Sequence, residues 1–143
     1  MSAEVAVFVA RRYGRQVLLL HRVPSDGSYW HVVAGEVEAG ESARQAALRE
    51  LREETGLVAD LGECLEIVES SASCSRERGE DASANELAVD VSITCYRVDA
   101  PANWEPVLNG EHDAHRWCPP SAAADSLVWP ATARALRRLI LEK

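Results

Sequence analysis

The segment from Glu41 to Thr55 has the composition of a long amphipathic helix, and it constrains the fold more than any other part of the chain. It is rich in Ala, Leu, Arg and Glu, and Gly56 directly after it is a residue that commonly ends a helix. Ala47, Leu48 and Leu51 form an apolar stripe along this helix. Because such a stripe is stable only when it is buried, the rest of the chain has to supply a layer on which the helix docks.

Segments typical of β-strands lie on both sides of this helix. Residues 5–9 and 17–20 are apolar, and the polar, glycine-containing stretch between them predicts a hairpin. We expect further strands at 29–33, 61–71, 87–98 and 115–117, a polar mobile loop at 70–86, and a closing helix at 131–141. This order predicts a single α/β domain over residues 1–143, with a mixed β-sheet covered on both faces.

Composition and charge narrow the range of partners. Of the 143 residues 47% are hydrophobic, which suits a domain with its own core. No apolar run approaches the roughly 20 residues needed to span a bilayer, and the first residues do not resemble a secretory signal, so we expect a cytoplasmic protein that does not bind membranes. A formal charge of −8 argues against nucleic-acid binding. The four cysteines show no zinc-binding spacing and are expected to be free thiols.

Three glutamates share one face of the expected helix. Glu50, Glu53 and Glu54 stand at positions i, i+3 and i+4, so their carboxylates point the same way. Most clusters of this kind are solvated surface, and Arg49 and Arg52 can offset part of the repulsion. Mg²⁺, however, prefers oxygen ligands and is usually shared between a few carboxylates and substrate phosphates. The spacing alone is compatible with both interpretations.

The surrounding residues favour the metal site. The stretch contains Gly35, five residues, Glu41, seven residues, and then Arg-Glu-Leu-Arg-Glu-Glu-Thr-Gly-Leu over 49–57. This resembles the complete Nudix box, and a motif of this length is far more specific than a short glycine-rich loop. The resemblance implies an α/β/α sandwich in which the box forms a loop-helix-loop, and a hydrolase that cleaves a pyrophosphate bond in a nucleoside-diphosphate-linked substrate. It departs from many members at Val33 and Ala34, where those members have proline and glycine.

The resemblance also implies roles for individual residues. Mg²⁺, or Mn²⁺ in its place, would be held by the carbonyl of Gly35 and the carboxylates of Glu50, Glu53 and Glu54. Glu41 would support the metal ligands from the start of the helix. Arg49 would orient a glutamate through an ion pair. Glu53 and Glu54 are also candidates for the catalytic base.

Residues outside the box are weaker candidates. Glu111 could act as the base, but it could equally be an exposed loop acid. His112 is a candidate substrate contact, although a lone loop histidine is more often solvated. Arg22 could meet a phosphate, and Trp30, like Trp117, could stack on a base, although aromatic side chains more often serve the core.

The sequence leaves the substrate open. Short motifs around 18–31 and 111–117 and Trp129 are similar to enzymes acting on dATP-like nucleotides and dihydroneopterin triphosphate, which favours a triphosphate cleaved to monophosphate and pyrophosphate. The segment 111–117 is also similar to diadenosine-tetraphosphate hydrolases, and a dinucleoside polyphosphate or a nucleotide sugar is the alternative substrate. A nucleotide-sensing module without catalysis is the rival from another class. The choice between monomer and homodimer stays open.

Overall fold

The structure is a computed structural model that describes residues 2–62, 64–70 and 90–141. Seven strands form one sheet in these residues: β1 (Ser2–Arg11), β2 (Gln16–Arg22), β3 (Trp30–His31), β4 (Val33–Glu36), β5 (Cys64–Ser70), β6 (Asp90–Asp99) and β7 (His112–Cys118). β1 and β6 are parallel and the other pairs are antiparallel, so the sheet is mixed as predicted. None of the helices in this part of the chain is long and apolar enough to cross a membrane.

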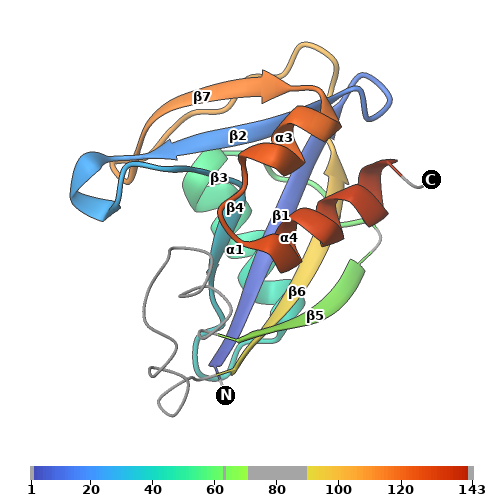
Figure 1. Cartoon of the computed structure of the whole chain (residues 1–143). Coiled ribbons are helices and arrows are strands. Elements are labelled where there is room, and N and C mark those ends of the chain that lie inside the picture. Colours follow the sequence, from blue (N-terminus) through green and yellow to red (C-terminus); the bar gives the residue numbers. More distant parts are fainter. Residues whose placement is uncertain (1, 63, 71–89, 142–143) are drawn as a thin grey trace.

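Strand β1 divides the sheet into two wings. Only the end of β1 pairs with β2, through Ala10 with Val17 and Arg11 with Gln16, whereas its first half pairs with β4. β2 then continues beyond β1 and pairs with β3 on one side and β7 on the other. The wing of β2, β3 and β7 therefore extends away from β1, as Figure 1 shows.

Side chains of β1 alternate between two separate cores. Ala6, Phe8 and Ala10 face the first core, which contains residues of α3 (Pro120–Ser126) and α4 (Pro130–Leu136). Val5, Val7 and Val9 face the second core, which contains Ala46, Ala47 and Leu51 of α1 (Ala43–Thr55). In Figure 1, α3 and α4 lie in front of the sheet and α1 lies behind it. The α/β/α sandwich and the docking stripe of the predicted helix are confirmed.

Several predicted boundaries are wrong. The single strand expected at 29–33 is two strands, because β3 pairs with β2 whereas β4 pairs with β1. Helix α3 was not expected; it begins at Pro120, because proline is well tolerated in the first turn of a helix. The closing helix starts as α4 and continues as a π-helical turn, η3 (Arg137–Leu141).

Other expectations fall partly outside the described residues. The predicted loop at 70–86 lies outside them except for its first residue, which ends β5. Cys64 and Cys118 are free thiols, as expected, Cys95 is buried, and Cys74 lies outside the described residues.

Candidate functional site

Helix α1 is fixed at both ends by local sequence. The Ser42 side chain accepts the N–H of Gln45, and the Gln45 side chain accepts the N–H of Ser42, which forms a capping box. At the other end Gly56 adopts a left-handed φ of 80°, and its N–H donates to the carbonyl of Arg52. The glutamates of the box are therefore presented from a short, well-anchored helix, which limits how far their backbone can move.

Strand β4 approaches α1 closely at Gly35. A Cβ atom on this glycine would overlap the carboxylate of Glu50. Gly35 pairs with Val5 in the centre of the sheet, so its backbone is not free to move away. Any side chain at this position would displace the Glu50 carboxylate, so the glycine of the box is needed for that carboxylate to lie against β4.

Arg49 is the centre of an ion-pair network on α1. Its Nε donates to Glu41 at 2.7 Å, and a terminal nitrogen donates to Glu50, also at 2.7 Å. A longer contact reaches Glu53 at 3.3 Å. The hydrogen bonds from Arg49, together with a backbone N–H, hold the pKa of Glu41 at about 2. The ion pair expected of Arg49 is present, and it fixes the Glu50 carboxylate against Gly35.

Glu54 differs from the other glutamates because it is enclosed. Its side chain is 2% exposed, and neither carboxylate oxygen has a hydrogen bond of ordinary geometry within the described residues. Its ion-pair contact is with His112, whose Nε2 lies 3.9 Å from Oε1. Burial, and after it the neighbouring Glu50 carboxyl, raise the pKa of Glu54. Such an arrangement costs free energy that a bound cation or a proton would offset.

The donor set fits a hard divalent cation in part. Glu50 and Glu54 lie together beside Gly35 and offer the oxygen ligands that Mg²⁺ and Mn²⁺ prefer. Glu53 does not join them, because its carboxylate is 51% exposed and faces Arg49. Accordingly, no group of three acidic, histidine or cysteine side chains converges on one point among the residues that the structure describes. Glu53 would have to leave Arg49 to complete the set.

The opposite wall of this site comes from β2 and from the start of β7. His112 is 4% exposed, so the expectation of a solvated histidine is wrong: it begins β7 rather than lying in a loop. Glu111 just before it is exposed, yet it is close enough to Glu54 to help raise the pKa of that carboxyl. Arg22 lies 3.7 Å from Glu111. The structure thus brings three of the outside candidates to the side of the sheet that carries Glu54.

Trp30 and His31 point to opposite faces of the sheet. Trp30 packs against the core of α3 and α4, and Arg116 lies over its ring at 4.3 Å, so this tryptophan is not brought together with the glutamates. His31 lies on the other face, where burial of its ring, the positive charge of Arg22 and that of His112 lower its pKa to about 4. His31 is half-buried as a residue, but its Nδ1 atom is enclosed.

Sequence reasoning did not identify His31. The alternation of side chains along a strand indicates which face His31 occupies only when the pairing of β3 is known. In the structure His31 pairs with Leu20, which belongs to the second core.

Trp117, the other aromatic candidate, lies in the second core. It packs edge-to-face on Trp104 at 6.1 Å, and the guanidinium of Arg11 lies 3.9 Å from its ring centre. Its Nε1 donates to Glu105 at 2.7 Å. These contacts hold Trp117 against the segment that contains Trp104 and Glu105, which agrees with a structural role for this ring.

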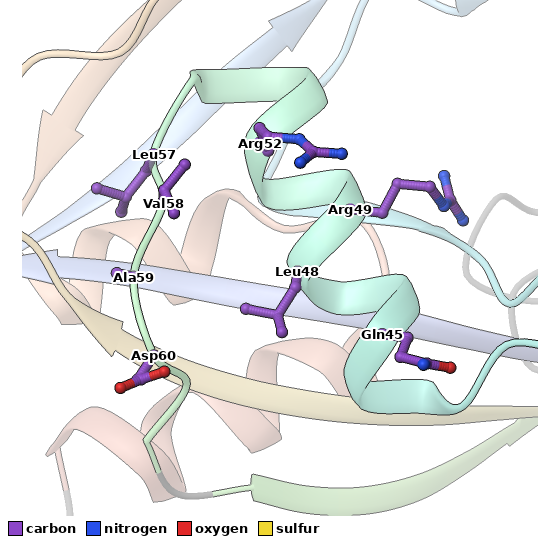
Figure 2. Close-up of a pocket in the computed structure, with 8 residues that line it drawn as sticks. All are labelled: Gln45, Leu48, Arg49, Arg52, Leu57, Val58, Ala59 and Asp60. Atoms are coloured by element: carbon purple, nitrogen blue, oxygen red, sulfur yellow. The ribbon is translucent and has the colours of Figure 1, made fainter.

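A separate pocket of about 580 Å³ lies between α1 and the segment that follows it. Figure 2 shows Leu48 pointing from α1 toward the backbone of 57–60. The lining residues are Gln45, Leu48, Arg49, Arg52, Leu57, Val58, Ala59 and Asp60. Since the carboxylates of Glu50 and Glu54 are not among them, the candidate reaction centre lies beside Gly35 and His112 rather than in this pocket.

A carboxylate-bearing helix held against a glycine of a mixed sheet is the arrangement that the box implies, and comparison with known proteins identifies its class. The NUDIX domain matches residues 2–139, and the chain belongs to the Nudix family. It is similar to the CTP pyrophosphohydrolase of Escherichia coli K12, with 33% identity over 90% of this chain and 84% of that protein.

Two further comparisons define how far the likeness extends. A Myxococcus xanthus protein named octanoyltransferase is 34% identical over 96% of this chain, but the match covers only 36% of that protein. The chain thus spans less than half the length of two curated relatives, 36% and 46%. The solved structure of the E. coli dihydroneopterin triphosphate pyrophosphohydrolase shares the fold, with a TM-score of 0.69, 24% identity, and coverage of 99% of this chain and 96% of that chain.

Proposed function

We propose that this Nudix domain is a divalent-metal-dependent pyrophosphohydrolase that cleaves a nucleoside triphosphate, or a related pterin triphosphate, to the monophosphate and pyrophosphate. The observation that carries this proposal is the enclosed carboxylate of Glu54 beside Glu50. Such a pair is unfavourable in an empty protein interior and favourable next to a cation. Mg²⁺ or Mn²⁺ bound there would neutralise the pyrophosphate and stabilise the charge that develops on the leaving phosphate.

The residues of the chain have separate tasks in this proposal. Gly35 lets α1 approach β4 and offers its carbonyl as a ligand, and Arg49 holds Glu50 in place. His112 lies against Glu54 and limits its movement within the enclosed space. Glu53 stays at the rim, where it can meet a second cation or the incoming phosphates.

Glu111 is the proposed base for the attacking water. Its carboxylate is 56% exposed, so it retains access to solvent, and it lies on the wall that faces Glu54. The 3.7 Å contact with Arg22 is long enough to break when a phosphate arrives. Arg22 would then bind the phosphate, and Glu111 would be released to accept a proton.

Two similar proteins are named for their action on triphosphates, the CTP pyrophosphohydrolase and the dihydroneopterin triphosphate pyrophosphohydrolase. Their names favour a triphosphate as the substrate of this chain. The acidic chain, with a formal charge of −8, would repel a triphosphate unless cations mediate binding. The proposal therefore includes strict dependence on divalent metal for substrate binding as well as for turnover.

A substrate screen tests the proposal directly. The purified chain is incubated with Mg²⁺ or Mn²⁺ and with nucleoside triphosphates, dihydroneopterin triphosphate, dinucleoside polyphosphates and nucleotide sugars, and the products are identified by mass. We expect monophosphate and pyrophosphate from at least one triphosphate and no turnover with EDTA. Cleavage of only dinucleoside polyphosphates or nucleotide sugars would move the substrate to that class. Tight nucleotide binding without any product would make the chain a sensing module.

A further inference from the structure

Three side chains at the edge of the sheet form a chain of hydrogen bonds that the proposed function does not use. The Nδ1 atom of His21 lies 2.7 Å from Oδ1 of Asp113. The Nε2 atom of the same ring lies 3.4 Å from the hydroxyl oxygen of Ser28. Since a carboxylate only accepts, Nδ1 carries a proton toward Asp113, and in the neutral tautomer Nε2 accepts from the serine hydroxyl. A serine, an imidazole and a carboxylate are thus arranged in sequence.

The fold positions the imidazole from two sides. His21 pairs with Trp30 across β2 and β3, and their rings lie 5.0 Å apart. Against β7 the register shifts after His21, since His21 pairs with Ala114 and Arg22 with His112. Asp113 is the extra residue of this bulge. A β-bulge redirects a side chain locally, and here the redirected carboxylate meets the His21 ring.

Ser28 occupies an uncommon backbone conformation. Its φ is +52°, a value that residues other than glycine rarely adopt. The preceding residue, Gly27, has a φ of +113°. The N–H of Gly27 donates to the carbonyl of Pro24 at 3.2 Å, which ties this turn together. Ser28 is exposed, so a small molecule can reach its hydroxyl. Backbone conformations of this kind cluster at functional sites because the surrounding structure must maintain them.

We propose that Ser28 is a nucleophile, with His21 as its general base and Asp113 as the residue that positions His21, and that it is acylated by activated carboxylic esters. The Ser28 oxygen bonds to the ester carbonyl carbon, and its proton passes to Nε2 of His21. The carbon–oxygen bond to the leaving alcohol breaks, and that alcohol takes the proton from His21. A water molecule then repeats the sequence on the acyl-serine and releases the carboxylic acid.

The choice of ester follows from what surrounds Ser28. A serine–histidine distance of 3.4 Å is loose but within the range of such pairs before substrate binds. The turn is open to solvent, and such a site offers little stabilisation to the oxyanion of a poorly activated substrate. Esters with a good leaving group are therefore the substrates, and amides are not.

This site is independent of the proposed pyrophosphohydrolase. His21 stands two residues after Leu19 on β2, whose side chains alternate, so its side chain lies on the same face of the sheet as Leu19, which belongs to the core with α3 and α4. Glu54 belongs to α1, which packs on the opposite face. Failure of one activity therefore leaves the other unaffected.

The test treats the full chain with p-nitrophenyl acetate and, separately, with a fluorophosphonate, and locates the adduct by peptide mass mapping. We expect one adduct, on Ser28. Ser28→Ala should abolish it, whereas Ser25→Ala, an exposed serine of the same turn, should react like the wild type. His21→Gln should slow acylation by about 100-fold, the usual contribution of a positioned base, and Asp113→Asn should slow it to a similar degree.

Melting curves of all variants show whether they fold, and Ser28→Gly provides a second variant that lacks the hydroxyl and suits the positive φ. Hydrolysis of the best nucleotide substrate should be unchanged within a few-fold in both Ser28 variants. An adduct on another residue, or wild-type acylation rates in folded His21→Gln, would overturn the proposal, and the three side chains would then serve only to brace the turn.

Discussion

Among single residues, Glu54 connects the energetics of the fold to the proposed chemistry. A carboxylate with 2% exposure, a neighbouring carboxyl at Glu50 and a histidine at 3.9 Å is poorly placed for stability alone. Proteins keep such groups where their charge is used. In the absence of metal, the raised pKa favours the protonated form, so metal binding should release a proton from this site.

Replacing the box glutamates with glutamine tests their role in turnover. Glu54→Gln and Glu53→Gln keep the side-chain volume and remove a negative charge. We expect turnover of the best substrate to slow on the order of 10²-fold or more, the scale for losing one preorganised electrostatic group. Steady-state kinetics at saturating Mg²⁺ measures this effect.

The control for these variants is Glu66→Gln. Glu66 lies on β5, is exposed and stands outside the box. Its variant should remain within a few-fold of wild-type activity. Equal activity of all three variants would show that the box carboxylates have no part in turnover.

Gly35→Ala tests the close approach of β4 and α1. The added methyl group has to displace Glu50, since the backbone of Gly35 is held by its pairing with Val5. We expect a loss of stability of about 1–3 kcal/mol, the usual cost of overpacking. Turnover should also slow by about 10-fold or more, because a proposed metal ligand has moved. Urea unfolding and steady-state kinetics measure the two effects. Wild-type behaviour in both would mean that Glu50 can move without consequence.

Among the elements, α1 depends on a loop that folds back onto it. Glu41 lies before the helix, yet it binds Arg49 two turns later, and Glu38 donates its N–H to the Glu41 carboxylate. The loop of residues 37–42 is thereby tied to the centre of the helix. Removing this connection should affect both the stability of α1 and the position of Glu50.

Glu41→Gln should show this connection through its pH dependence. The pKa of Glu41 is lowered from 4.5 to about 2, so its contribution to stability is fully present above about pH 4.5 and is lost as the pH falls toward 2. The variant should melt below the wild type at pH 7, and the difference should shrink between pH 4.5 and 3. Glu38→Gln, whose carboxylate is 3.7 Å from Arg49 and 67% exposed, should show a smaller difference. A difference that does not depend on pH would exclude the ion pair as its cause.

The sequence predicted the elements whose signals are local, and it missed those decided by long-range contacts. The glycine stop and apolar stripe of α1, the hairpin of β1 and β2, and the Nudix box all lie within short stretches. The split between β3 and β4 depends on which partner each strand finds, and this cannot be inferred from an apolar run. The buried position of His112 and the inward face of His31 follow from the register of β7 and β3, for the same reason. The likeness to the Nudix box covers the α1 wall of the site and not the wall formed by β2, β3 and β7.

In the whole molecule, the sheet separates two regions with different chemistry. One face carries α1, the carboxylates and the buried histidines, and the other carries α3, α4 and the Ser28–His21–Asp113 chain. A ligand bound at the proposed site would contact α1, β4 and the start of β7. Binding there should therefore stabilise the whole domain, since these elements belong to one sheet and one of its two cores.

Thermal melting with added metal tests this coupling. Mg²⁺ or Mn²⁺ that binds only the folded state at 100 times its Kd adds about 2.7 kcal/mol, which corresponds to a rise in Tm of roughly 5–11 °C for a chain of this size. EDTA should reverse the rise. In the Glu50→Gln, Glu54→Gln double variant the rise with metal should disappear, because both proposed carboxylate ligands have been removed. The matched control, Glu66→Gln, should keep the full rise. A rise of equal size in the double variant would place the metal elsewhere on this acidic chain and would remove the main support for a catalytic site beside Gly35.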